Sequence, residues 1–116
     1  MKKVVLGLAV GVLLATSGAH AQFTGPSVAG HISTVEDVQD ARLGRYVTLT
    51  GNIVAHQRGD FYTFRDTTGE IRVEIERPVW SGRSIGPETR VRLLGEVDTG
   101  LAGRYIWVKS LDVLDK

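Results

Sequence analysis

The stretch that decides the fold reads Tyr46-Val-Thr-Leu-Thr-Gly-Asn-Ile53, then Phe61-Tyr-Thr-Phe-Arg-Asp66, then Ile71-Arg-Val-Glu-Ile-Glu76. Apolar and polar residues alternate in these segments, which predicts β-strands with one buried face and one solvated face. Asp66 and Gly69 occupy the first and fourth positions of a tight turn, so the second and third segments are expected to form a hairpin. A three-stranded sheet of this kind needs a second layer, or closure on itself, to cover its apolar face.

The residues on either side add a short helix and a crossover. Ser33 and Glu36 have the spacing of a capping box, which predicts a helix from about residue 34 to residue 41. Two prolines and two glycines between residues 77 and 88 exclude a long regular element there and predict a crossover loop. Trp80 is the large apolar residue of that loop, and we expect it to plug one end of the folded domain.

Two more strands are predicted over residues 89–98 and 104–114. The apolar residues change phase within the last strand, which predicts a bulge near Ser110. Together with the long first strand, interrupted by Gly51, these elements predict an all-β chain folded as a small five-stranded OB-fold barrel with a short N-terminal helix. An SH3-like barrel is the closest competing architecture.

The beginning of the chain reads as an export signal. Lys2 and Lys3 precede an apolar run over residues 4–15, and Ala19-His20-Ala21 fits a small-x-small cleavage site. The apolar run is shorter than the roughly 20 residues that a membrane span needs. We therefore predict a cleaved signal peptide at 1–21, a flexible leader at 22–32, an OB-fold domain at 33–116, and a periplasmic location for a protein not embedded in the membrane.

The composition limits what the mature chain can do. Removing 21 of 116 residues leaves 95, enough for one small domain, expected to be a monomer. Without cysteine there is no disulfide scaffold, thiol redox chemistry or thiolate metal site. Loss of Lys2 and Lys3 reduces 14 basic residues to 12 against 13 acidic ones, a net charge of −1 that does not provide the basic surface nucleic acid requires. No nucleic-acid partner is therefore expected. His31 and His56 show no metal-binding spacing, so no metal or other cofactor is expected either.

The outward side of the first three strands is the predicted ligand-binding surface, because OB folds recognise ligands across strands two and three. Its candidate residues are Thr48, Thr50, Asn52, Thr63, Arg65, Arg72 and Glu74. Phe61 is the only aromatic residue we assign to this surface, so hydrogen bonding to a small molecule, glycan or envelope protein fits better than stacking on bases. Glu74 and Glu76, two apart on one strand, have a spacing that could serve glycoside hydrolysis, but a solvated sheet face explains them better.

An ordered set of short motifs resembles the bacterial OB-fold family of the YgiW/YdeI type. Beside the export signal and the three strand segments, the set contains Phe23-Thr-Gly-Pro26, Trp80-Ser-Gly82 and Val91-Arg-Leu-Leu-Gly-Glu-Val-Asp98. The resemblance implies a small periplasmic OB-fold protein that acts in envelope stress tolerance, binds a protein or small molecule and has no catalytic residues. An adaptor that docks on an envelope or outer-membrane protein is the first alternative, and a glycan-cleaving enzyme is a distant third.

Overall fold

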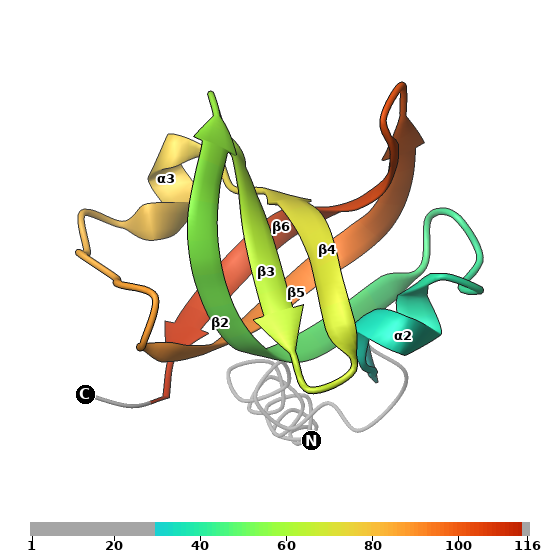
Figure 1. The fold of residues 1–116 in the computed structure, drawn as a ribbon, viewed down its shortest axis with the longest axis horizontal. Helices are drawn as coiled ribbons and strands as arrows, with labels where there is room; N and C mark the ends of the chain where they lie inside the picture. The colour runs from blue at the N-terminus through green and yellow to red at the C-terminus, as the bar shows by residue number, and fades with distance from the viewer. Residues whose placement is uncertain (1–29, 115–116) are drawn as a thin grey trace, which may run out of the picture.

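The computed structural model describes residues 30–114, and the predicted signal peptide and most of the predicted leader lie outside them (Figure 1). The described residues contain a two-residue strand, five long strands and two short helices. In chain order these are β1 (His31–Ile32), α2 (Val35–Val38), β2 (Tyr46–Arg58), β3 (Phe61–Asp66), β4 (Gly69–Glu74), α3 (Arg77–Trp80), β5 (Arg90–Gly100) and β6 (Gly103–Val113). The first strand thus begins inside the segment assigned to the leader.

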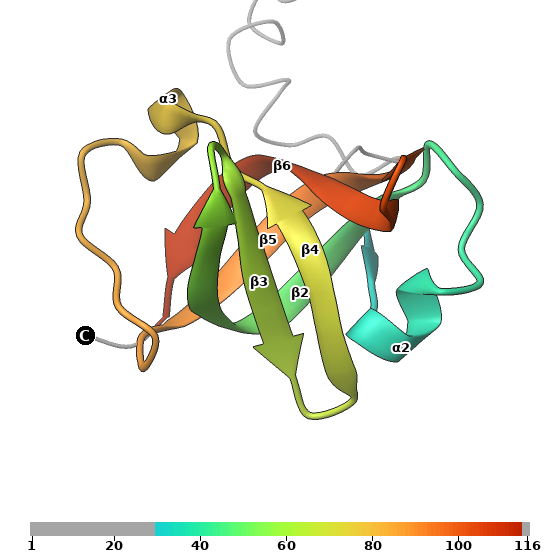
Figure 2. The ribbon, with the colours of Figure 1, turned by 45° about the horizontal axis from the view of Figure 1, so that its top comes forward.

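The five long strands close into a barrel. The sheet order is β1-β2-β3-β4-β6-β5, and β2 also pairs with β5, which joins the two ends. Strands β4 and β6 are parallel, while β2–β3, β3–β4, β5–β6 and β2–β5 are antiparallel. The long strand β2 curves through the barrel wall and pairs with β5 along its first half and with β3 along its second half (Figures 1 and 2). This is the predicted OB barrel rather than the SH3-like alternative.

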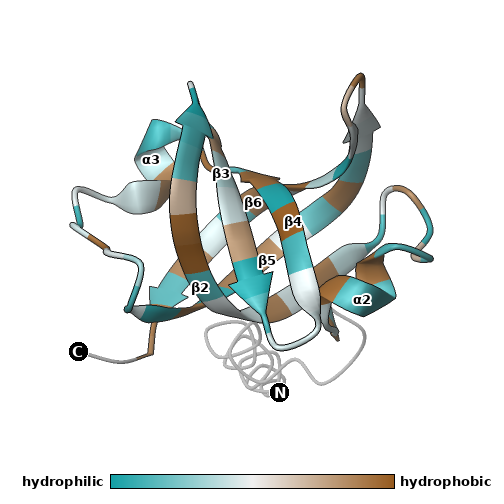
Figure 3. Ribbon diagram, in the orientation of Figure 1, coloured by the Kyte–Doolittle hydropathy of each residue, from teal (hydrophilic) through white to brown (hydrophobic). Residues whose placement is uncertain are grey.

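The barrel interior is filled by the apolar residues of the alternating pattern. Figure 3 shows apolar bands separated by polar ones along the strands, and Phe64, Leu49 and Leu93 are among the side chains with no exposed surface. Gly51 is also buried, because a Cβ atom there would lie 2.3 Å from the carbonyl oxygen of Arg65. The missing side chain lets β3 pack directly on the bend of β2.

The predicted bulge near Ser110 is confirmed. Leu94 pairs with Ser110, whereas the next residue, Gly95, pairs with Val108, so Lys109 is the extra residue on β6. Because one residue is skipped, both Val108 and Leu111 point into the core.

Helix α2 begins one residue later than the predicted capping box, so the assignment of Ser33 and Glu36 was wrong. The structure uses Thr34, whose hydroxyl accepts from the Asp37 N–H at 3.2 Å, while the Asp37 carboxylate accepts from the Thr34 N–H at 3.1 Å. The cause is tertiary: the carboxylate of Asp66 accepts from the N–H of Val35 at 2.9 Å and fixes the first turn. The helix has four residues, fewer than predicted.

The crossover contains one helical turn, α3, that carries Trp80. Trp80 packs against the core, and its ring meets the ring of Tyr62 edge-on at 5.1 Å, but the side chain stays partly exposed. Trp80 therefore covers the core at this end of the barrel only in part, unlike the predicted plug. Strand β4 ends at Glu74, and Glu76 is the N-cap residue of α3, so these two glutamates do not share one strand face as the sequence reading assumed.

Candidate functional site

The outer surface of β3, β4 and β6 gathers three aromatic rings with charged groups of both signs. Cross-strand pairing places Glu74 opposite both Phe61 and Trp107, and Arg72 opposite Tyr105. Arg72, Glu74 and Trp107 alternate with buried neighbours, so their side chains lie on the outer side of the barrel. Phe61 and Tyr105 lie beside them through the cross-strand pairs. We call the following group the aromatic face: Phe61, Arg72, Glu74, Asp98, Tyr105, Trp107 and Lys109.

Arg72 lies at the centre of the aromatic face. Its guanidinium carbon is 5.0 Å from the centre of the Phe61 ring and 5.4 Å from that of Tyr105, and the two rings meet edge-on at 5.4 Å. The guanidinium also donates to the carbonyl oxygen of Gly103 at 3.3 Å. Arg72 therefore connects the rings to the β5–β6 hairpin, one of the loops that border ligand sites in OB folds.

Carboxylates surround the same rings. Burial raises the pKa of Glu74, and the neighbouring carboxylates of Glu76, Asp60 and Asp98 raise it further. Burial also raises the pKa of Tyr105, together with the charges of Asp98 and Glu74, and the Tyr105 hydroxyl donates to Asp98 at 3.3 Å. The carboxylates make the electrostatic potential negative around the two cations of the face, Arg72 and Lys109. A negative potential repels phosphates and suits a ligand that offers hydroxyl or amide donors.

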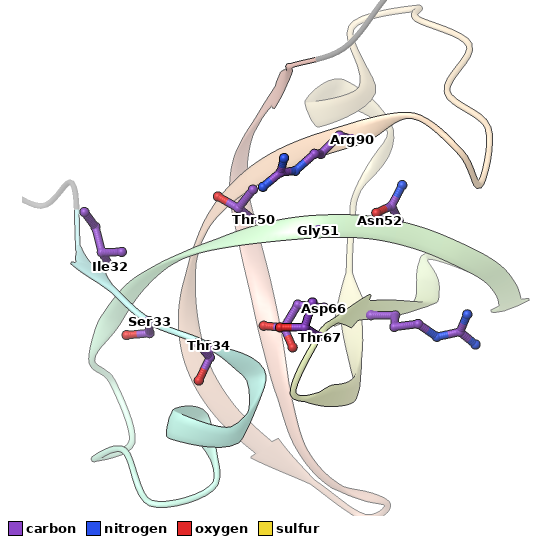
Figure 4. A pocket seen from close by; sticks show the side chains of 10 residues that line it. Ile32, Ser33, Thr34, Thr50, Gly51, Asn52, Asp66, Thr67 and Arg90 are labelled. Atoms are coloured by element: carbon purple, nitrogen blue, oxygen red, sulfur yellow. The ribbon is translucent and has the colours of Figure 1, made fainter.

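A second concave site lies on the other end of β3. A pocket of about 680 Å³ opens over β2 between β1 and the β3–β4 turn, and Thr50, Asn52, Arg65 and Arg90 are among the residues that line it. We call it the Thr50 pocket (Figure 4). Arg65 lies four positions beyond Phe61 along β3, a distance of about 13 Å, so the pocket is distinct from the aromatic face.

The seven predicted site residues fall into two groups and one outlier. Arg72 and Glu74 belong to the aromatic face, with Thr63 beside Arg72 in the β3–β4 ladder. Thr50, Asn52 and Arg65 line the Thr50 pocket. Thr48 lies beside Ile32, where β1 pairs with β2.

Several of these side chains already have protein partners. The amide group of Asn52 donates to the carbonyl oxygens of Pro87 and Thr89, both at 3.1 Å, and so holds the crossover against β2. The hydroxyl of Thr63 accepts from Gln57 at 2.9 Å. Arg65 donates to Glu70 through two nitrogens at 2.8 and 2.6 Å.

The sequence reading missed Tyr105 and Trp107. Their alternation with Ile106 and Val108 places them on the outer side of the last strand, but the sequence does not show that this strand lies parallel to β4. The expectation that Phe61 is the only aromatic residue on the surface was therefore wrong. The strand order of OB folds, in which the last strand lies beside the third strand of the meander, would have predicted that Phe61, Tyr105 and Trp107 lie close together.

Among residues 30–114, no three His, Cys, Asp or Glu side chains lie close enough together to hold a metal ion. The His56 ring packs on Tyr62 with ring centres 4.6 Å apart, and its Nε2 lies 2.9 Å from the Gly59 carbonyl oxygen.

None of the described helices is long and apolar enough to cross a membrane.

Comparison with known proteins agrees with the barrel. The family described as bacterial OB fold (BOF) protein matches residues 13–113. The chain belongs to the bacterial OB-fold family. Protein YgiW of Escherichia coli K12 is 39% identical over an alignment of 125 positions that covers 96% of each chain. The calcium-regulated OB-fold protein CarO of Pseudomonas aeruginosa is 39% identical over 102 residues, or 88% of each chain.

A solved structure of the hypothetical protein YgiW from E. coli has a TM-score of 0.70 to this bacterial OB-fold chain at 37% identity. The match covers 79% of this chain and 97% of that one, so it includes nearly the whole solved barrel.

Proposed function

We propose that this bacterial OB-fold protein is a non-catalytic binding protein of the periplasm that acts in envelope stress tolerance. The single observation that carries the binding role is the aromatic face. It brings Phe61, Tyr105 and Trp107 together beside the two hairpin loops, where OB folds take their ligands. The export signal read from residues 1–21 supports the periplasmic location.

A glycan is the ligand class that the aromatic face fits best. Partly exposed aromatic rings can pack on the apolar side of a sugar ring, while Glu74 and Asp98 can accept from its hydroxyls and Arg72 can donate to them. Nucleic acid fits less well, because the carboxylates repel phosphates and Lys109 and Arg72 already lie over the rings. Periplasmic glycans supply this chemistry.

Binding by variants tests the proposal. Isothermal titration with solubilised peptidoglycan fragments is expected to show binding that weakens at least about tenfold in Trp107→Ala and in Tyr105→Ala, since loss of one ring contact is worth roughly 1.4 kcal/mol or more. Leu114→Ala is the control, because its exposed side chain lies at the far end of the described chain. Equal affinity in all four proteins would remove the aromatic face as the binding surface.

The adaptor role keeps one specific observation in its favour. Leu101, at the tip of the β5–β6 hairpin, is fully exposed next to the aromatic face. An exposed apolar side chain on a loop tip is a suitable contact for another protein. If an envelope protein is the ligand, Leu101→Ser will reduce the capture of that protein from envelope extracts. Glycan binding by the same variant will then be absent or unchanged. Equal capture by Leu101→Ser and the wild type would count against the adaptor role.

A glycan-cleaving role receives less support. It would need a pair of carboxylates held at a fixed separation across the scissile bond. Glu74 lies on β4, whereas Glu76 lies beyond the end of that strand and is exposed. Unchanged peptidoglycan after prolonged incubation with the protein is the expected result, and release of fragments that stops in Glu74→Gln would restore the enzyme hypothesis.

A further inference from the structure

The floor of the Thr50 pocket is a part of β2 that pairs with no described strand on one side, between the end of β1 and the start of the β3 ladder. The Ser33 N–H donates to the Thr48 carbonyl oxygen at 3.0 Å, so the main-chain groups of Thr48 point toward β1 and away from β5. Main-chain groups two residues apart on a strand point to the same side, so those of Thr50 do too. Strand β1 ends at Ile32, and the β3 ladder begins only at Asn52, so within residues 30–114 no strand residue pairs with Thr50 on that side.

One cation of the pocket is available for a ligand. Arg65 is bound by Glu70, with 2.6 Å between nitrogen and oxygen. Among the described residues Arg90 has no ion pair and no side-chain hydrogen bond, and Figure 4 shows its guanidinium lying toward the side chain of Thr50. A free guanidinium beside a hydroxyl and an open main-chain N–H is suited to a carboxylate.

The pocket carboxylate, Asp66, is already satisfied. It accepts from the N–H of Val35, from the N–H and hydroxyl of Thr68 and from the N–H of Gly69, at 2.6 to 3.2 Å. These four donors occupy its acceptor positions, and it forms no ion pair with Arg90. Figure 4 shows Asp66 and Thr67 on the side of the pocket opposite Arg90.

The remaining walls favour a hydroxylated ligand. The amide hydrogens of Asn52 are used by the crossover, which leaves its carbonyl oxygen as an acceptor, and Thr67 adds a hydroxyl. Ile32 is 93% exposed and forms an apolar wall at the other side. The volume of about 680 Å³ is within the range of small-molecule sites.

We propose that the Thr50 pocket is a second ligand site, independent of the aromatic face, that binds a small hydroxycarboxylate. Arg90 and the Thr50 N–H hold the carboxylate, while Thr50, Asn52 and Thr67 bind the hydroxyl groups. The apolar side of the ligand lies against Ile32. This site does not depend on what the aromatic face binds.

NMR titration of the ¹⁵N-labelled protein with D-gluconate tests the assignment, and sorbitol is the matched neutral probe. Gluconate is expected to shift the amide signals of Thr50, Asn52 and Thr67 and to leave the Trp107 indole N–H unchanged, while sorbitol binds at least about tenfold more weakly, because it lacks the charge that Arg90 recognises. Arg90→Ala is expected to weaken gluconate binding at least about tenfold, and Thr50→Val to weaken it while preserving the branched shape.

Arg58→Ala is the control variant, since Arg58 is an exposed arginine at the far end of β2 and does not line the pocket. It is expected to keep gluconate affinity within about twofold, because exposed substitutions away from a site have small effects. The proposal is overturned if gluconate shifts no pocket signals, if sorbitol binds equally well, or if both arginine variants weaken binding alike. Shifts confined to the aromatic face also overturn it, while leaving the proposed glycan site standing.

Discussion

The ammonium nitrogen of Lys109 lies 3.2 Å from the centre of the Trp107 ring. Side chains two residues apart on a strand point to the same side, and Lys109 is the extra residue of the bulge. Lys109 therefore stays on the outer side beside Trp107, while Leu111 returns to the core. The contact covers one side of the Trp107 ring with a cation supplied by the protein itself. A ligand of the aromatic face must therefore use the other ring edges or displace Lys109.

The two tryptophans are expected to separate stability from binding. Trp80 packs against the core and Tyr62, so Trp80→Ala should lower the free energy of unfolding by about 1 to 3 kcal/mol, less than for a fully buried ring. Trp107 lies on the outer surface, so Trp107→Ala should cost about 1 kcal/mol or less. Urea unfolding of both variants measures the difference, and a larger loss in Trp107→Ala would contradict the assigned roles.

Replacement of Gly51 is expected to destabilise the barrel. An added methyl group would lie 2.3 Å from the Arg65 carbonyl oxygen and 2.9 Å from the Phe64 ring. Gly51→Ala should therefore destabilise the protein by about 1 to 3 kcal/mol or more. Gly86→Ala is the matched control, because nothing lies within 4 Å of its added methyl group, and it should change stability by no more than about 0.5 kcal/mol. Similar melting temperatures for the two variants would rule out this packing argument.

Asp66 should make the stability depend on pH in the acid range. Burial raises its pKa, but the hydrogen bonds from Thr68, Val35 and Gly69 outweigh that effect and bring the pKa below the ordinary value of 3.8. A lowered pKa in the folded state contributes stability above pH 3.8, and that contribution is lost as the pH falls through the folded-state pKa. Thermal melts should show Asp66→Ala less stable than the wild type at pH 7, with the gap closing below pH 3.8; a constant gap would disagree with this linkage.

Glu74 should behave in the opposite way. Its raised pKa means that the folded protein holds the proton more tightly than the unfolded chain, so the charged form at neutral pH opposes folding. Glu74→Gln is therefore expected to be at least as stable as the wild type at pH 7, and any advantage should disappear as the pH falls below the ordinary value of 4.5. A clear loss of stability in Glu74→Gln at pH 7 would indicate a structural hydrogen bond instead.

The sequence was sufficient for features that depend on neighbouring residues. Alternation located the strands, and Asp66 and Gly69 located the hairpin turn. The change of phase predicted a bulge near Ser110, and the extra residue is its neighbour Lys109. These features follow from the strand period and from turn chemistry.

Features that depend on distant contacts could not be read in the same way. Two capping boxes, one starting at Ser33 and one at Thr34, fit the sequence equally well, and Asp66, 31 residues beyond Val35, selects the second. The aromatic face likewise depends on the parallel pairing of β4 with β6, which no local pattern encodes. For the same reason the sequence grouped Arg65 with Arg72, although the fold places them at different sites.

Chemical-shift mapping with solubilised peptidoglycan fragments tests whether the aromatic face is the ligand-binding surface. We expect the fragments to shift the Trp107 indole N–H and the amides of Arg72 and Tyr105 in the wild type. The amide shift of Arg72 should vanish in the Tyr105→Ala and Trp107→Ala double variant while its fold is retained. Shifts confined to residues away from β3, β4 and β6, or shifts that persist in the double variant, would contradict the account.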